Sequence, residues 1–74
     1  MGVDMINRPP HYARLDPEPI DVIEAWGLGY HLATAVKYIS RAGHKEDEIQ
    51  DLEKAVWFLN RKIQQLKNEK ENGI

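Results

Sequence analysis

The longest regular pattern of apolar positions lies in the C-terminal third of the chain. Apolar residues recur there in alternating steps of three and four, at Ile49, Leu52, Val56, Leu59, Ile63 and Leu66. This spacing is typical of a coiled-coil stripe along one side of a helix and continues for about 2.5 heptads. Acidic residues at positions 46–48 suit the positive end of a helix, so we expect one long helix over residues 47–68.

Two shorter helices are predicted before it. Asp16 can cap a helix over residues 17–26, whose first turn tolerates its two prolines because the amides there have no partner within the helix. Gly27 is expected to end that helix. A second helix is expected over residues 30–42. Its apolar stripe consists of Leu32, Ala35, Val36 and Ile39.

The first 16 residues carry no helical pattern. Pro9 and Pro10 remove two backbone donors and fix φ, so this segment is expected to be an extended arm. No repeat or linker divides the chain. The predicted fold is therefore all-α, a single domain over residues 1–74, with an arm at 1–16 and a three-helix core at 17–70 that ends in the long helix.

The long apolar stripe has two uses that the pattern alone leaves open. The simpler use is packing against the other two helices of the same chain. Trp57 and Phe58, however, project to opposite sides of the stripe, so one stripe cannot bury both. Large apolar side chains off the main stripe are typical of a second interface, and a domain this small buries only about 60% of its unfolded surface. We therefore expect a homo-oligomer.

Composition argues against several classes of protein. The chain has no cysteine, which removes disulfides and thiolate metal sites, and its three histidines lack metal-ligand spacing. The formal net charge of -2 argues against binding to duplex nucleic acid, which draws on a basic surface. No run approaches the roughly 20 apolar residues of a membrane span. A cytoplasmic protein without membrane partners is expected.

Candidate chemistry centres on the end of the second helix. Lys37 and Arg41 stand one turn apart on a helix face opposite the apolar stripe, and Lys45 follows in the next turn. Such cations suit phosphate groups, but they are also common at helix C-termini, where they complement the dipole. Lys54 and His11 are further candidates. The chain has no glycine-rich phosphate loop, so side chains would have to hold a phosphate.

Two acidic pairs are candidates for a metal site. Asp21 and Glu24 are three residues apart, as are Glu48 and Asp51, and two such pairs facing each other could hold Mg²⁺. The arrangement resembles the all-helical nucleoside triphosphate pyrophosphohydrolases, which carry paired acids on antiparallel helices, although Asp21 replaces the usual first glutamate. The alternative is that these acids are solvated or complement helix N-termini.

Four sequence blocks together resemble a small phage and prophage family of unknown function. They are Pro-Pro-His-Tyr at 9–12, Ile-Asp-Val-Ile-Glu at 20–24, Ala-Val-Lys-Tyr-Ile-Ser-Arg-Ala-Gly-His-Lys at 35–45 and Asp-Leu-Glu-Lys-Ala-Val-Trp-Phe-Leu at 51–59. The resemblance covers residues 7–63. One larger member, from a podovirus of enteric bacteria, is a nucleotide kinase that lacks a P-loop and phosphorylates deoxynucleoside monophosphates. The resemblance implies a nucleotide-phosphate site in a protein of a bacterial host cell.

The resemblance and the residue pattern together assign expected roles. The expected phosphate ligands are Lys37, Arg41, Lys45 and Lys54. The expected catalytic residues are His11 and Asp51. The aromatic residues available to stack on a base are Tyr12, Tyr38 and Trp57.

Three kinds of function follow as hypotheses. The first is a nucleotide-binding protein which, if it is an enzyme, is a nucleoside monophosphate kinase that uses Mg²⁺ and takes phosphate from ATP or another nucleoside triphosphate. The second is a non-catalytic module that sequesters a nucleotide or a nucleotide-derived signal. The third is either a Mg²⁺-dependent pyrophosphohydrolase-like enzyme or a purely structural oligomer whose cations are a solvated face.

Overall fold

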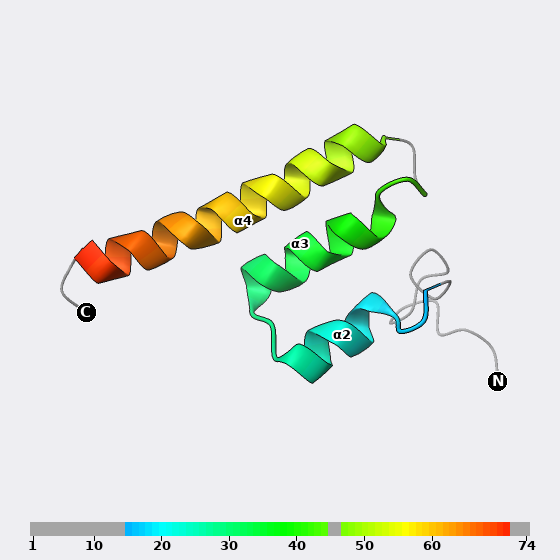
Figure 1. Cartoon of the computed structure of the whole chain (residues 1–74), viewed down its shortest axis with the longest axis horizontal. Coiled ribbons are helices and arrows are strands. Elements are labelled where there is room, and N and C mark those ends of the chain that lie inside the picture. The colour runs from blue at the N-terminus through cyan, green and yellow to red at the C-terminus, as the bar shows by residue number, and fades with distance from the viewer. Residues whose placement is uncertain (1–14, 45–46, 72–74) are drawn as a thin grey trace.

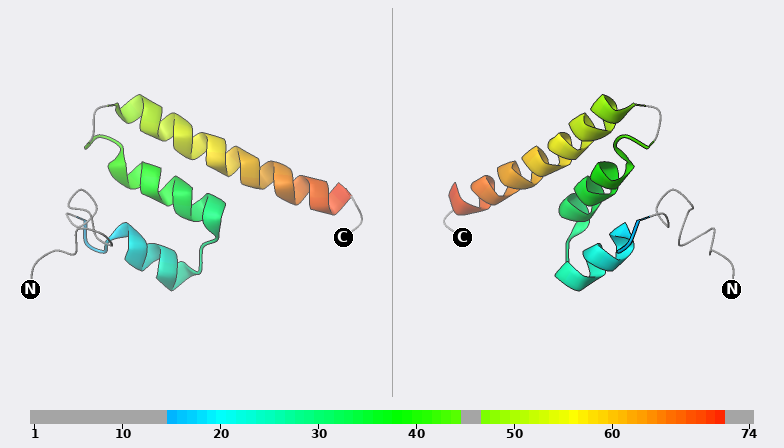
Figure 2. Two further views of the ribbon diagram at one scale, coloured as in Figure 1. Left: turned by 180° about the vertical axis from the view of Figure 1, so that it is seen from behind. Right: turned by 45° about the vertical axis from the view of Figure 1, so that its right-hand side comes forward.

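The computed structural model describes residues 15–44 and 47–71. In these ranges the chain forms three helices and no strand, namely α2 (Pro19–Trp26), α3 (Tyr30–Arg41) and α4 (Glu48–Glu71). Helix α3 lies between the other two in every view (Figures 1 and 2). The all-α class and the three helices are confirmed. Of the predicted arm, only residues 15 and 16 lie within the described part. None of the three helices combines the length and apolar character that crossing a membrane requires.

Helix α2 begins two residues later than the sequence predicts. Its N-cap is Glu18, not Asp16, and Pro19 occupies the first helical position. A residue before proline is disfavoured in the α region, and Glu18 is accordingly extended, with φ -71° and ψ 155°. The backbone amide of Glu18 donates to Asp21 Oδ2 at 3.1 Å, which secures the start of the helix. Gly27, with φ +63°, ends α2 after Trp26 as predicted.

Helices α3 and α4 form an antiparallel hairpin. Asp47 caps the start of α4 as predicted, because its Oδ1 accepts a hydrogen bond of 2.9 Å from the amide of Gln50. Helix α4 has 24 residues and α3 has 12, so their lengths are about 36 and 18 Å. The C-terminal part of α4 therefore extends well past the start of α3 (Figure 1).

The buried hydrophobic residues of α3 and α4 are small. Ala35 and Ala55 are 2% and 3% exposed, and Pro19 of α2 is the other buried apolar residue of the described part. Aromatic side chains join the two helices, because the ring centroids of Tyr30 and Tyr38 each lie 6.0 Å from that of Phe58. The face of α4 that turns toward α3 consists of Asp51, Ala55, Phe58 and Lys62, which are buried or half-buried.

The coiled-coil stripe of α4 is not buried against the other described helices. Its residues are exposed, with Ile49 at 70%, Leu52 at 45%, Val56 at 54%, Leu59 at 37%, Ile63 at 48% and Leu66 at 50%. The interpretation that the stripe packs on the first two helices is therefore wrong. The reason is geometric, because the Ala55 face that contacts α3 is rotated about 100° around the helix axis from the stripe. We call these six residues the α4 stripe.

Candidate functional site

Several expected site residues meet where the α3–α4 hairpin closes. Tyr38 and Arg41 lie in the last turns of α3, and Asp51 and Lys54 lie in the first turns of α4. Because the two helices are antiparallel, the end of one lies beside the start of the other (Figure 1). Residues that are 10 to 16 positions apart in the sequence thus come together. We call these four residues the hairpin site.

The ring of Tyr38 is the centre of this site. Lys54 Nζ lies 5.4 Å from the ring centroid and Arg41 Cζ lies 5.8 Å from it, so a cation from each helix approaches the same ring. Both distances fall within the roughly 6 Å at which a ring quadrupole attracts a cation. Phe58 stacks on Tyr38 with centroids 6.0 Å apart and planes 18° apart. Tyr38 is therefore engaged by Phe58 and by the two cations, and a nucleotide base would have to compete with them for its ring.

Arg41 also faces a buried carboxylate. Its Nε lies 4.0 Å from Asp51 Oδ1, and the side chains are 32% and 5% exposed. The Arg41 Nε is itself buried and makes no hydrogen bond. The separation is too long for a hydrogen bond, so the pair is joined by charge attraction across the two helices. Asp51, expected to be a catalytic residue or a metal ligand, thus lies opposite a guanidinium.

A tight turn after α3 places Arg41 at the hairpin end. Gly43 has φ +84°, and the amide of His44 donates to the carbonyl of Arg41 at 2.9 Å. A Cβ at position 43 would lie only 2.8 Å from Glu48 Oε2. Position 43 therefore suits glycine for its backbone conformation, whereas the Glu48 side chain is exposed and can turn away.

Lys37 lies one turn before Arg41 and is exposed. The carbonyl of Lys37 accepts a hydrogen bond of 2.7 Å from Ser40 Oγ, while its ammonium group projects from the outer side of α3. Lys37 and Arg41 share a helix face, as the sequence predicts, so Lys37 extends the cationic surface of the hairpin site toward solvent. His11, Tyr12 and Lys45, three other expected site residues, lie outside the described residues.

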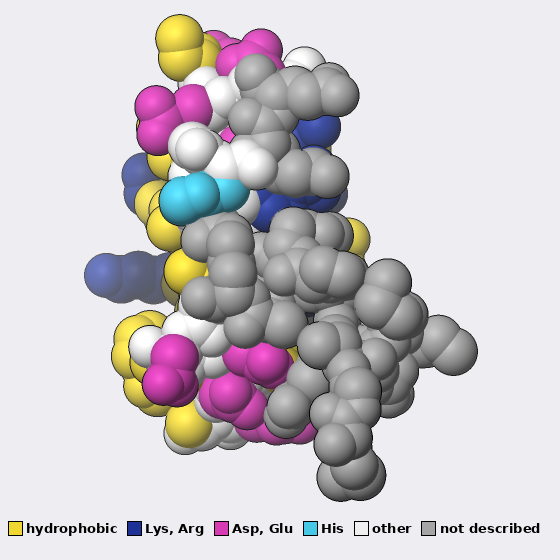
Figure 3. Space-filling view, turned by 90° about the vertical axis from the view of Figure 1, so that its right-hand side faces the viewer, with side chains coloured by type: hydrophobic (Ala, Val, Ile, Leu, Met, Phe, Trp, Pro, Cys, Tyr) yellow, Lys and Arg dark blue, Asp and Glu magenta, His cyan; other side chains and the backbone are white. Residues whose placement is uncertain are grey.

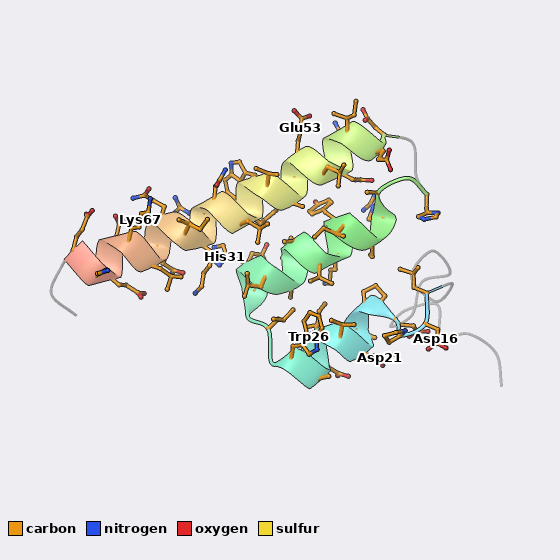
Figure 4. The ribbon with its side chains drawn as sticks, in the orientation of Figure 1. Asp16, Asp21, Trp26, His31, Glu53 and Lys67 are labelled. Carbon is orange, nitrogen blue, oxygen red and sulfur yellow. The ribbon has the colours of Figure 1, made fainter. Side chains whose placement is uncertain are left out.

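The four expected metal ligands do not gather in one chain. Asp21 and Glu24 lie on α2 and Glu48 and Asp51 on α4, and α3 separates these two helices (Figure 4). Asp21 also caps α2 through the amide of Glu18. Across residues 15–44 and 47–71, no group of three or more acidic or histidine side chains is placed to hold a metal ion. Binding of Mg²⁺ by these residues stays a prediction.

An aromatic cluster adjoins the hairpin site. Phe58 lies at its centre, with ring centroids 4.9 Å from Trp57, 6.0 Å from Tyr30 and 6.0 Å from Tyr38. Sequence reasoning named Trp57 and Tyr38 but missed this use of Phe58. The available signal was its position seven residues after Asp51, which places both on one helix face. Trp57 itself is 59% exposed and lines a shallow surface depression of about 430 Å³.

A second depression, of about 220 Å³, lies beside the start of α3. Its lining is polar and consists of His31, Arg61, Gln64, Gln65 and Asn68. Sequence reasoning did not single out this group, because residues of two separate helices form it.

Comparison with known proteins places the chain in a family without assigning it an activity. No curated protein and no solved structure matches it significantly. Residues 6–60 match a family described as a protein of unknown function, DUF3310. This match spans α2, α3 and the part of α4 that carries the hairpin site. The chain is therefore a member of the DUF3310 family.

Proposed function

We propose that this chain is a nucleotide-binding protein that holds the phosphate groups of its ligand with Lys54, Arg41 and Lys37. One observation supports the proposal most, namely the convergence of Lys54 and Arg41, from two different helices, on the ring of Tyr38. A phosphate binds best where donors approach from more than one direction, and the hairpin supplies a lysine and an arginine in that arrangement.

The two converging cations have different parts in the proposed site. Lys54 is exposed and offers a point charge that can leave the ring of Tyr38 and meet a phosphate. Arg41 is about one-third exposed and turns its Nε toward Asp51, which leaves the outer edge of the guanidinium for the ligand. Asp51 and Tyr38 thus hold the arginine in place before the ligand arrives, so little ordering is needed on binding.

The base of the nucleotide is assigned to Trp57. This side chain is exposed, lies one helical turn after Lys54, and packs edge-on against Phe58, which supports it from the protein side. An exposed indole provides a stacking surface that tolerates any base. In this arrangement the ring of Tyr38 stays in contact with Lys54 and Arg41 and does not stack on the base.

The geometry favours binding over catalysis. Asp51, the carboxylate that a kinase reaction would use, is 4% exposed and faces Arg41. A group in that position is poorly placed to receive a proton from a substrate or to share a metal ion with it. We therefore propose a binding module, with phosphoryl transfer from ATP or another nucleoside triphosphate as the second function to be tested. From the family resemblance we also propose a phage origin and action in the bacterial cytoplasm, and from the exposed apolar residues of α4 we propose an oligomeric state.

A thermal-shift panel tests the proposal. Wild-type protein is heated with nucleoside and deoxynucleoside mono-, di- and triphosphates, with inorganic phosphate, and with or without Mg²⁺. A ligand that binds only the native state raises the midpoint of unfolding. We expect nucleotides to raise it, Lys54→Ala to remove the effect, and the exposed Lys70→Ala to retain it. Absence of a shift with every nucleotide contradicts the proposal.

Product analysis then separates the two functions. Incubation with ATP, Mg²⁺ and each deoxynucleoside monophosphate is expected to leave the nucleotides unchanged if the protein only binds them. Formation of diphosphates would identify a kinase instead.

A further inference from the structure

The described part of the chain buries little apolar surface. No large hydrophobic side chain in it is fully buried, and the buried hydrophobic residues of α3 and α4 are two alanines. Six large apolar side chains meanwhile line one side of α4 as the α4 stripe. Soluble monomers rarely expose a contiguous apolar stripe of this length, and such a stripe usually marks an interface.

The described helices leave the α4 stripe uncovered. Helix α3 packs on the neighbouring face of α4, through Ala55 and Phe58, and α2 lies on the far side of α3 (Figure 2). Figure 3 shows hydrophobic side chains along one edge of the molecule, with basic side chains both among them and on the opposite side. The stripe lies about 100° around α4 from the face that carries Asp51, whereas Trp57, to which the base is assigned, lines a depression together with Ile49, Leu52 and Val56 of the stripe.

We propose that the α4 stripe is the interface of a homodimer in which two α4 helices pack antiparallel as a short coiled coil. Ile49 of each copy lies opposite Leu66 of the other, Leu52 opposite Ile63, and Val56 opposite Leu59. Each of the six stripe residues then packs against a stripe residue of the other copy, and each pair occurs twice because the dimer is symmetric. The inference deepens the proposed oligomeric state by naming its surface and direction, and it does not depend on nucleotide binding.

The charge distribution along α4 favours the antiparallel direction. The first half of the helix, residues 48–59, carries three acidic residues and one lysine. The second half, residues 60–71, carries four basic residues and two acidic ones. Antiparallel packing sets the acidic half of each helix beside the basic half of the other, whereas parallel packing sets like beside like.

The positions that flank the stripe agree with this direction. Glu53, Asn60 and Lys67 recur at seven-residue steps along one edge of the stripe, and Glu53 and Lys67 lie on the side of α4 that faces away from α3 (Figure 4). In the antiparallel pair, Glu53 of each copy lies near Lys67 of the other, with the two Asn60 residues between them. Flanking charges of this kind select the partner and its direction.

The parallel alternative brings like charges together. In a parallel pair, the residue directly before Ile49, Val56 or Ile63 of one helix lies beside the residue five positions further along the other helix. Glu48 would then meet Glu53, and Lys62 would meet Lys67. Like charges at such positions are destabilising, so the sequence of α4 disfavours a parallel dimer.

Size-exclusion chromatography with light scattering tests the interface. We expect wild-type protein to have twice the 8.6 kDa mass of the chain. Val56→Glu should give a monomer that keeps its helical circular dichroism, because Val56 is already 54% exposed in the single chain. Trp26→Glu, at a residue that is 70% exposed on α2, is the matched control and should remain a dimer.

A monomeric wild type, as expected if residues 1–14 of the same chain cover the stripe, overturns both the dimer and the oligomeric proposal. An oligomer unaffected by Val56→Glu overturns only this interface.

Charge exchange tests the direction. Glu53→Lys and Lys67→Glu should each weaken dimerisation about tenfold, because each places like charges at two symmetric contacts. An equimolar mixture of the two variants should recover the wild-type affinity, since a heterodimer then has two opposite-charge pairs. No recovery in the mixture contradicts the antiparallel pairing.

Introduced cysteines give a second test of direction, because the natural chain has none. Positions 49 and 66 are about 26 Å apart along the helix. Ile49→Cys and Leu66→Cys proteins should each stay free of disulfide dimers under mild oxidation, and their mixture should form them. Dimers of Ile49→Cys with itself would show parallel packing and overturn the inference.

Discussion

Arg41 Nε lies 4.0 Å from Asp51 Oδ1, and this pair joins the end of α3 to the start of α4. The Asp51 side chain is 5% exposed, so its carboxylate has lost most of its contact with water. A buried charge needs a charged partner, and Arg41 is the basic residue placed to be one. Arg41, which is proposed to bind phosphate, therefore also helps to hold α3 against α4.

The losses of stability from removing the two members of this pair should not be additive. Arg41→Ala leaves the buried carboxylate without its partner and is expected to lower the free energy of unfolding by about 1–3 kcal/mol. Chemical unfolding followed by circular dichroism, at one protein concentration, measures this value. In Arg41→Ala/Asp51→Ala the loss should be smaller than the sum of the two single losses. Strictly additive losses would show that the two side chains do not interact.

Gly43→Ala and Gly27→Ala should lower stability by similar amounts. Both glycines have positive φ, +84° and +63°, so alanine is strained at either position. At position 43 the new methyl group would also lie 2.8 Å from Glu48 Oε2, but this atom is the end of an exposed, flexible side chain that can turn away. We expect a loss of about 1 kcal/mol for each variant. A much larger loss for Gly43→Ala in urea unfolding would mean that the Glu48 side chain is held in place.

The ring of Tyr38 should matter more for ligand binding than its hydroxyl group. Tyr38→Phe keeps the ring that holds Lys54 and Arg41, so nucleotide affinity should change little. Tyr38→Leu removes both cation–ring contacts and should weaken nucleotide binding about three- to tenfold. Titration of both variants with the same nucleotide measures the difference. A large loss in Tyr38→Phe would instead point to direct contact of the hydroxyl with the ligand.

The helices could be predicted from sequence because their signals are local. Asp47, Gly27 and Gly43 mark helix ends by capping and backbone preference, and the step pattern identifies α4. The first cap was placed wrongly at Asp16, because the restriction that Pro19 imposes on Glu18 was not applied.

The face of α4 that contacts α3 could not be predicted in this way. The apolar step pattern favours the α4 stripe, but Phe58, on another face of α4, contacts α3. The contacts of Phe58 with Tyr30 and Tyr38 depend on both helices at once, and neither helix reveals them alone. The pattern thus identified an apolar surface correctly but left open whether the surface packs within the chain.

The candidate site could be predicted only in part for the same reason. The i, i+4 spacing on α3 predicted the shared face of Lys37 and Arg41. Convergence with Lys54 follows from the antiparallel hairpin, which brings separate segments together. The paired acids looked equivalent in sequence, but α3 lies between Asp21 and Asp51.

Isothermal titration of nucleotides into wild-type, Lys54→Ala and Lys70→Ala protein tests the central claim most directly. Lys54 is exposed, so its removal should leave the fold intact while removing one phosphate donor. The proposed site predicts that Lys54→Ala weakens the binding of a nucleotide at least about tenfold and that Lys70→Ala leaves it unchanged. Equal affinity of all three proteins, or no binding by the wild type, would contradict it.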